Sequence, residues 1–209
     1  MEQVFFINPV AGKRDASAEL VPRIQAAARQ LQLPQPQIVV TQYAGQAREA
    51  ARQYAASGTP AALYACGGDG TLNELVQGAA GSANVAVGCV PCGSGNDYVR
   101  NFGAAGQAPF LDFAAQLQAQ PCRVDLLQTS LGIGIDICAA GLDAQVAYGI
   151  PKFRRLPGCG GTAAYTLSIL QAMLSRFGHK LRVAINGKEH TGTYMMAAIC
   201  NGGYYGGGY

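Results

Sequence analysis

Short apolar segments alternate with helix-like segments through the first 125 residues of the chain. The strand-like segments are Gln3–Ile7, Ile38–Val40, Ala61–Cys66 and Val85–Val90. Segments typical of helices separate them, namely one from Asp15 or Ser17 to about Leu31, Gln46–Ser57, and Leu72–Ala79 with Thr71 as its expected cap. This alternation predicts a parallel sheet with helices on both faces, and in such sheets ligands bind beyond the carboxyl ends of the strands.

The pattern changes after Pro121. The expected strands are Arg123–Thr129, Gly132–Ala139, Lys180–Ile185 and Thr191–Cys200, and the expected helices are Asp143–Gly149 and Ala163–Phe177. The dipeptide Asn186-Gly187 is a strong hairpin signal between two of these strands. We therefore predict an α/β fold in which an N-terminal parallel-sheet domain, residues 1–125, precedes an incomplete antiparallel β-sandwich domain, residues 126–209.

One expected helix carries a large apolar stripe made of Leu167, Leu170, Leu174 and Phe177. The helical spacing of this stripe favours core packing against the second domain. A wall of a groove for acyl chains is the alternative.

Composition bounds the function only loosely. Hydrophobic residues make up 49% of the chain, which is enough for a sizeable core, and the net charge of +3 is too small to indicate nucleic-acid binding. Seven cysteines, an odd number, favour free thiols in a reducing compartment, and the Cys89/Cys92 pair lacks a second pair at zinc-site spacing. No apolar run reaches the roughly 18 residues that a membrane-spanning helix needs.

The sharpest motif runs from Gly67 to Glu74 and reads GGDGTLNE. A strand is expected to enter it and a helix to leave it, so its glycines allow backbone N–H groups to approach an anion at a helix N-terminus. Asp69 would repel a phosphate unless a cation lies between them, which favours a nucleotide phosphate with Mg²⁺ nearby. The alternative is a simple strand-to-helix turn.

Two more loops follow strands of the same expected sheet. They are NPVAGK, from Asn8, and PCGSGND, from Pro91. All three loops would lie side by side at one edge of the sheet. The P-loop pattern GxxxxGK[ST] and the dinucleotide pattern GxGxxG are both absent at these turns.

These three motifs, in this order and at these spacings, resemble the diacylglycerol kinase catalytic domain. The family includes bacterial soluble diacylglycerol kinases as well as sphingosine and ceramide kinases. Later segments extend the resemblance to the whole chain, namely Val124-Asp125, the GLDA segment from Gly141, and the run NGGYYGGG from Asn201. The resemblance implies transfer of the γ-phosphate of ATP to the hydroxyl of diacylglycerol, with ATP and Mg²⁺ as cofactors and phosphatidic acid as the product.

The resemblance also implies site residues. The residues expected to bind the nucleotide are Asn8, Pro9, Val10, Ala11, Gly12, Thr41, Gly67, Gly68, Asp69, Gly70, Thr71, Leu72, Asn73 and Ser94. The residues expected to take part in catalysis are Asp69, Asp97 and Asp125, which match acids of a metal- and water-linked network; no direct metal ligand is assigned.

On this reading, residues 1–125 are the ATP-binding domain and residues 126–209 are part of the lipid-side domain. The family's general base and an Mg²⁺-binding acid are expected beyond Tyr209, so we expect the chain to be truncated at its C-terminus. The implied location is the cytoplasm, peripheral to the membrane, with a lipid partner, no nucleic acid, and a homodimer left open.

Three alternatives stay open. In the first, the acceptor is another lipid, of the sphingoid or acylglycerol type. In the second, the chain is a nicotinamide-dinucleotide kinase, a class of enzyme that shares the GGDG turn; Asn8-Pro9 and Asn96-Asp97 disfavour this alternative. In the third, the chain is a nucleotide-binding module without turnover.

Overall fold

The structure is a computed structural model, and it describes residues 1–12, 14–103, 106–154, 156, 158–159, 161–175 and 178–206. The chain divides into two compact units. Unit 1 comprises Met1–Asp136 together with the segment from Asn201 onward, and unit 2 comprises Ile137–Cys200. Each unit is described separately below.

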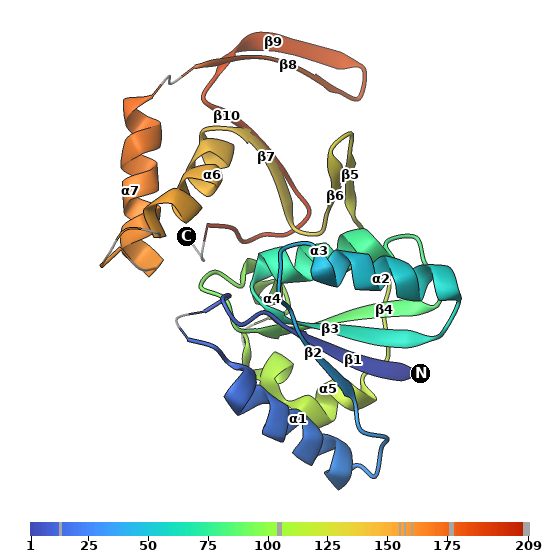
Figure 1. Cartoon of the computed structure of the whole chain (residues 1–209). Coiled ribbons are helices and arrows are strands. Elements are labelled where there is room, and N and C mark those ends of the chain that lie inside the picture. Colours follow the sequence, from blue (N-terminus) through green and yellow to red (C-terminus); the bar gives the residue numbers. More distant parts are fainter. Residues whose placement is uncertain are drawn as a thin grey trace. The chain divides into compact units, whose positions relative to one another are not determined.

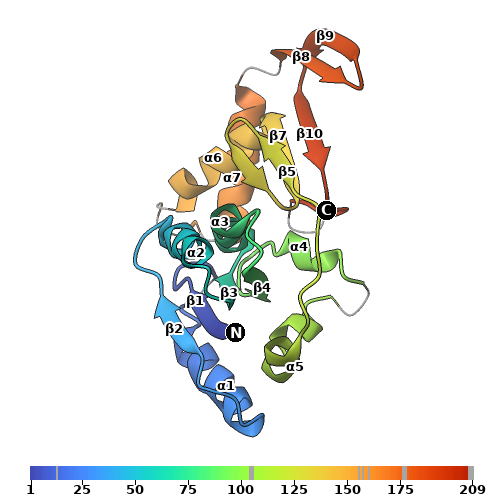
Figure 2. The ribbon, with the colours of Figure 1, turned by 90° about the vertical axis from the view of Figure 1, so that its right-hand side faces the viewer.

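Unit 1 is built on a four-stranded parallel sheet in the order β2-β1-β3-β4. The strands are β1 (Glu2–Ile7), β2 (Gln37–Val40), β3 (Ala61–Gly67) and β4 (Val85–Pro91). Helices α2 (Gln46–Ser57) and α3 (Asp69–Ala79) cover one face, and α1 (Ser17–Gln30) and α5 (Phe113–Gln118) cover the other (Figures 1 and 2). The prediction of a parallel sheet with helices on both faces is confirmed.

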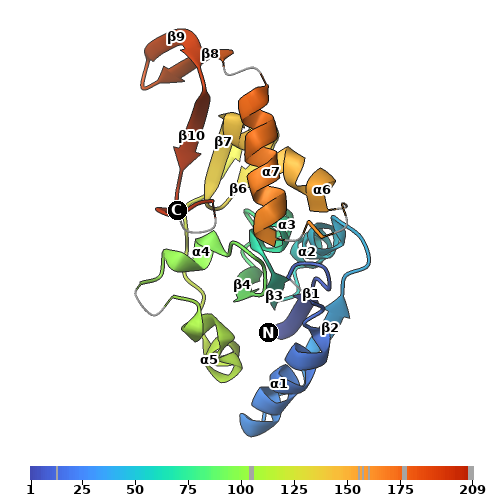
Figure 3. The same cartoon turned by 90° about the vertical axis from the view of Figure 1, so that its left-hand side faces the viewer.

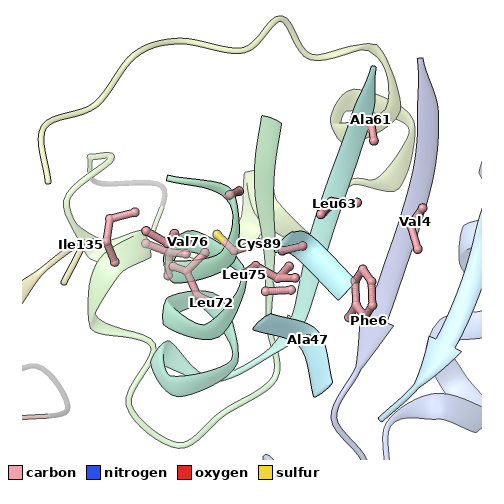
Figure 4. Packing of buried hydrophobic residues seen from close by; sticks show 14 residues of the cluster. Val4, Phe6, Ala47, Ala61, Leu63, Leu72, Leu75, Val76, Cys89 and Ile135 are labelled. Atoms are coloured by element: carbon pink, nitrogen blue, oxygen red, sulfur yellow. The ribbon is translucent and has the colours of Figure 1, made fainter. Parts of the chain in front are cut away.

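Each face of this sheet buries its own hydrophobic cluster. Residues Leu72, Leu75 and Val76 of α3 pack toward Phe6, Leu63 and Cys89 of the sheet, as Figure 4 shows. On the other face, Phe5 stacks on Tyr64 with ring centroids 4.3 Å apart, and Ile24 of α1 is fully buried beside them. Strand β3 is buried along its whole length, as expected for a parallel strand with a helix on each face.

Helix α3 begins earlier than its sequence indicates. Its first residue is Asp69, and the residue that precedes it is Gly68 in extended conformation, so the expected cap Thr71 lies inside the helix. The hydroxyl of Thr71 instead accepts a hydrogen bond from the Asn8 side chain at 3.0 Å. The expectation of a Thr71 cap was wrong, because the Thr71 hydroxyl is engaged by Asn8 and the helix begins three residues sooner, so Asp69 lies in the first helical turn.

Shorter elements complete unit 1. They are helix α4 (Asp97–Arg100), the 3-10 helix η1 (Ala108–Leu111), and the antiparallel pair β5 (Leu127–Thr129) and β6 (Gly132–Gly134). Asp112 caps α5, since its carboxylate accepts a hydrogen bond from the backbone N–H of Ala115 at 3.0 Å. Ile135, just after β6, is buried in the hydrophobic cluster on the α3 side of the sheet, so this segment packs against the core of unit 1.

The described residues of unit 2 form two antiparallel strand pairs and two helices. Strand β7 (Ile137–Gly141) pairs with β10 (Met196–Cys200), and β8 (His179–Ile185) pairs with β9 (Lys188–Tyr194). Helices α6 (Leu142–Arg154) and α7 (Gly161–Leu174) pack on each other (Figure 3). The predicted hairpin is confirmed, because Asn186 and Gly187 both have positive φ angles, 50° and 78°, as a two-residue hairpin turn requires.

The expectation that the apolar stripe of α7 packs into a core was wrong for Leu170 and Leu174, while Leu167 is half-buried. Leu170 and Leu174 are 50% and 89% exposed, and Phe177 lies outside the described residues. The buried face of α7 carries Ala164, Ser168 and Ala172 instead. Small residues let two helices approach closely, and Gly149 of α6 does the same, because a Cβ added at Gly149 would overlap the Ser168 side chain.

Candidate nucleotide site

The three glycine-containing loops meet at the carboxyl edge of the unit 1 sheet. The backbone N–H of Asn8, after β1, donates to the carbonyl of Cys66 in β3 at 2.9 Å. The backbone N–H of Cys92, after β4, donates to the carbonyl of Gly67 at 2.8 Å. The strand pairing therefore continues into the loops and fixes them as neighbours.

Two glycines are required where these loops approach each other. A Cβ added at Gly93 would overlap the backbone of Gly68, and one added at Gly12 would lie 2.7 Å from the carbonyl oxygen of Cys92. Real Cβ contacts with backbone atoms are longer, so any larger residue would push the loops apart. The resulting edge is made mainly of backbone, which is the arrangement that allows N–H groups to face an anion.

Asn8 fixes the first loop. Its side-chain oxygen accepts from the backbone N–H of Val10 at 3.1 Å, and its side-chain nitrogen donates to the Thr71 hydroxyl at 3.0 Å. Thr41, at the end of β2, donates from its backbone N–H to the carbonyl of Ile7 at 2.8 Å. Among the predicted nucleotide-binding residues, Asn8, Thr41 and Thr71 are thus brought to one end of the sheet.

The central and fourth loops are joined through carboxylate and amide groups. Asp69 Oδ1 accepts a hydrogen bond from the backbone N–H of Tyr98 at 3.2 Å, at the start of α4. Asn96, which is buried in a left-handed conformation, bonds to Gly93 twice, to its N–H at 2.9 Å and to its carbonyl at 2.8 Å. Asp97 is buried and pairs with Arg100 at 3.5 Å. Asn96 was not among the expected site residues, although it belongs to the PCGSGND loop.

The remaining predicted residues differ in their surroundings. Leu72 is buried in the core, while Val10, Gly12, Gly70 and Ser94 lie toward solvent. The buried Oδ1 atom of Asn73 has no hydrogen-bond partner among the described residues, which leaves an acceptor available one turn into α3. A small hollow is lined by Gly67, Gly68, Asp69, Pro91, Asn96 and Tyr98, together with apolar residues behind them.

Asp136 joins the acidic group, although the sequence did not single it out. It is buried, and burial raises the pKa of its carboxyl; a hydrogen bond from Asn101 lowers this pKa, and the nearby carboxylates of Asp69 and Asp97 raise it. Asp125 is exposed, and its backbone carbonyl accepts a hydrogen bond from the side chain of Asn201 at 2.8 Å. The catalytic role assigned to Asp125 stays a prediction.

The carboxylates of Asp69 and Asp97 are groups at this edge that could contact Mg²⁺ bound with ATP. Within the described ranges, no three His, Cys, Asp or Glu side chains are grouped closely enough to hold a metal ion by themselves. Mg²⁺ in kinases is usually held by one or two carboxylates together with phosphate oxygens and water. Asp69 and Asp97 beside glycine backbone fit that shared kind of binding and not a closed protein cage.

Families of known proteins match the chain over two segments. The family described as "Diacylglycerol kinase catalytic domain" matches residues 2–129. The chain belongs to this family. A second family, "YegS C-terminal NAD kinase beta sandwich-like domain", matches residues 136–209, in agreement with the antiparallel strand pairs seen there.

Bacterial lipid kinases are among the proteins that this chain resembles in sequence. A "Probable lipid kinase YegS-like" of Chromohalobacter salexigens is 30% identical over 173 residues, covering 81% of this chain and 54% of the relative. A "Diacylglycerol kinase" of Bacillus subtilis is 27% identical over 138 residues, covering 66% of this chain and 45% of the relative. The chain therefore spans about half the length of the curated relatives it matches.

A solved structure shares the fold. The crystal structure of a diacylglycerol kinase from Bacillus anthracis str. Sterne matches with a TM-score of 0.65 at 22% identity, covering 99% of this chain and 66% of that chain.

In the described part of the molecule, no helix has both the length and the apolar character needed to cross a membrane.

Proposed function

We propose that this chain carries the ATP-binding part of a lipid kinase that transfers the γ-phosphoryl group of ATP to the hydroxyl of diacylglycerol, giving phosphatidic acid. The observation that carries the proposal is the meeting of three loops at one sheet edge, with backbone of Gly68 and Gly93 in contact and Asp69 beside them. Membership of the diacylglycerol kinase catalytic-domain family supports ATP as the donor.

The loops supply the phosphate-binding groups. Gly12, Gly68 and Gly93 let the three loops approach closely, so that their backbone lies together at one edge of the sheet. Backbone N–H groups at this edge are proposed to bind the phosphate oxygens. Helix α3 begins at Asp69, so the positive end of its dipole lies at the same edge. These groups act on charge and position, which is what phosphoryl transfer requires of a protein.

Asp69 and Asp97 are proposed to work with Mg²⁺, because two carboxylates beside a triphosphate would otherwise repel it. When bound, Mg²⁺ would supply neutralisation of the charge on the phosphate oxygens. Asp69 also accepts from the Tyr98 N–H, so its carboxylate is held in one orientation. Asp125 is proposed as a third acid of the site on the resemblance alone.

The acceptor lipid is proposed from the relatives. Diacylglycerol appears in the name of the Bacillus subtilis relative, whereas the Chromohalobacter salexigens relative is named only as a lipid kinase. A lipid acceptor implies that the protein works at the cytoplasmic membrane surface, and this peripheral location belongs to the proposal. A homodimer remains an open part of it.

The test is transfer of labelled γ-phosphate from ATP into dioctanoylglycerol in mixed micelles, with sphingosine and monoacylglycerol micelles run in parallel. Label in phosphatidic acid supports the proposal, and label in another lipid product corrects the acceptor. Binding of Mg-ATP without label in any lipid indicates a nucleotide-binding module and contradicts the proposed activity of this chain.

A further inference from the structure

Helix α4 has only four residues, Asp97–Arg100, and a helix this short does not hold its shape by its own hydrogen bonds. Its position therefore depends on contacts with the rest of unit 1, namely burial of Val99 in the α3-side cluster and hydrogen bonds at its two ends. At its start, Asp69 Oδ1 accepts from the N–H of Tyr98. At its end, Asn101 donates from its backbone N–H to the carbonyl of Tyr98 at 3.2 Å.

The side chain of Asn101 connects this end of α4 to two distant segments. Its Nδ2 atom donates to the carbonyl of Tyr98 at 3.0 Å and to Oδ1 of Asp136 at 3.2 Å. Its Oδ1 atom accepts from the backbone N–H of Gly203 at 2.7 Å. One amide group thus joins three parts of unit 1.

The backbone of Asp136 also bonds to the segment that contains Gly203. Its carbonyl oxygen accepts from the N–H groups of Asn201 and Gly202, at 2.7 Å and 3.1 Å. The side chain of Asn201 in turn donates to the carbonyls of Asp125 and Ile135, at 2.8 Å and 2.9 Å. The chain leaves unit 1 after Asp136 and returns to it at Asn201, so the two crossings of the chain are bonded to each other.

A glycine is needed at the centre of this arrangement. A Cβ added at Gly202 would overlap the carboxylate of Asp136, whereas one added at Gly203 would lie 3.7 Å from Asn101 Oδ1, an ordinary contact. The buried carboxylate therefore lies against backbone, with Asn101 as its hydrogen-bond donor. A buried carboxylate without a donor is unfavourable, which makes the Asn101 contact stabilising.

We propose that Asp136 and Asn101 are positioning residues of the phosphoryl-transfer site. Together with the 201–203 segment they form a clasp that holds the end of α4, while Asp69 holds its start. The clasp thereby sets the position of Asp97, which the proposed function places beside the phosphates. The kinetic part of this inference rests on that proposed function, but the structural part does not.

Amide hydrogen exchange of the 209-residue chain, followed by NMR at Tyr98, tests the clasp directly. Asp136→Ala is expected to speed exchange of this amide about tenfold, the factor that one lost hydrogen bond gives, and Asp136→Asn, which keeps the Oδ1 acceptor, is expected to restore it. Exchange in Asp136→Ala within about twofold of the unsubstituted chain would overturn the proposal. Asn101 is exposed, so Asn101→Ala gives the same test where Asp136→Ala does not fold.

Gly202→Ala and Gly203→Ala form a matched pair. The first is expected to speed exchange at Tyr98 as Asp136→Ala does, and the second to leave it near the level of the unsubstituted chain. Equal effects of the two substitutions would mean that contact with Asp136 is not what matters, and would count against the clasp.

Kinetics separates positioning from simple loss of folded protein. Asp136→Ala is expected to lower kcat while KM for ATP changes little, because the glycine loops are untouched, and Asp136→Asn is expected to recover kcat. Equally low kcat in both variants, with unchanged exchange, would contradict a positioning role. If the unsubstituted chain transfers no phosphate, the proposed function fails, and the exchange measurements still decide whether the clasp holds α4.

Discussion

The backbone N–H of Tyr98 donates a hydrogen bond to Oδ1 of Asp69 over 3.2 Å, which joins the start of α4 to the start of α3. The Asp69 carboxylate therefore has a structural contact in addition to the catalytic role proposed for it. These two roles can be separated, because an amide at this position keeps the acceptor oxygen but removes the charge.

Substitution of Asp69 is expected to separate the two roles. Asp69→Asn should lower kcat about 10²- to 10³-fold with little change in melting temperature, since only the charge is lost. Asp69→Ala should lower kcat at least as much and also lower the melting temperature slightly, because the Tyr98 N–H loses its acceptor. Steady-state kinetics and thermal unfolding check both. Glu189→Gln, at an exposed ion pair of unit 2, is the control, and an unchanged kcat in Asp69→Asn would remove Asp69 from the site.

Substitution of the glycines tests the contact between the loops. Gly93→Ala should reduce the free energy of unfolding by about 1–3 kcal/mol, because the new methyl group would overlap backbone of Gly68. Gly70→Ala is the matched control, since no atom outside the helix lies within 4 Å of a Cβ there, and alanine at a helical position is at least as stable as glycine. Urea unfolding of both variants decides the point, and equal stabilities would show that the loops do not touch as described.

Two leucines of unit 1 test the core. Leu75 is fully buried between α3 and the sheet, so Leu75→Ala should lower the free energy of unfolding by about 2–5 kcal/mol. Leu131, at the turn between β5 and β6, is 98% exposed, and Leu131→Ala should change the free energy by less than about 0.5 kcal/mol. A larger loss of unfolding free energy in Leu131→Ala than in Leu75→Ala would contradict this description of the core.

Two thiols of unit 1, those of the buried Cys89 and the half-buried Cys92, make the free energy of unfolding depend on pH at alkaline pH. Burial raises the pKa of Cys89 to about 12, with the Asp69 carboxylate adding to the effect, and burial raises the pKa of Cys92 to about 11. In the unfolded chain these thiols ionise near pH 9, so the unfolded state releases protons first and stability falls as the pH rises above about 9. Each such thiol contributes about 1.4 kcal/mol per pH unit in that range.

Urea unfolding at pH 8, 9, 10 and 11 checks the thiol prediction, with Cys89→Ala as the comparison. The variant should show a shallower fall than the unsubstituted chain between pH 9 and 11. Identical slopes would mean that Cys89 ionises as readily in the folded protein as in the unfolded chain. Cys122 and Cys200 are exposed and should be the first cysteines to react with a thiol reagent.

The glycine loops could be predicted from the sequence because each follows a short buried strand. Parallel strands end at a common edge, so the order of strands and motifs is enough to bring Asn8, Gly68 and Gly93 together. The start of α3 was misplaced by three residues, because Thr71 offers a capping side chain, whereas Gly68, in extended conformation, precedes the helix without a side-chain cap.

The clasp around Asp136 was missed because its parts lie far apart in the chain. Asn101, Asp136 and Gly203 belong to no shared motif, and only the return of the chain to unit 1 brings them together. One signal was present in the sequence. Asp136 interrupts an otherwise apolar run, and a carboxylate in such a run must find hydrogen-bond donors.

The apolar stripe of α7 was misread for a related reason. Helical periodicity shows that a face is uniform but not which face is buried, and two small-residue positions here decided the packing. Ser168 lies against Gly149 of α6 and Ala164 is buried, while Leu174 is exposed. Gly149 of α6 allows this close approach, so the glycine was the feature of the sequence that indicated which face of α7 is buried.

The central claim is that the edge formed by Asn8, Gly68 and Gly93 binds the phosphates of ATP, and isothermal titration with Mg-ATP tests it most directly. We predict saturable binding at one site per chain, weakened at least about tenfold by Gly93→Ala, which displaces the loops, and unaffected by Leu131→Ala, which lies outside them. Binding that Gly93→Ala leaves unchanged would move the nucleotide elsewhere. No binding of Mg-ATP by the unsubstituted chain would contradict the account.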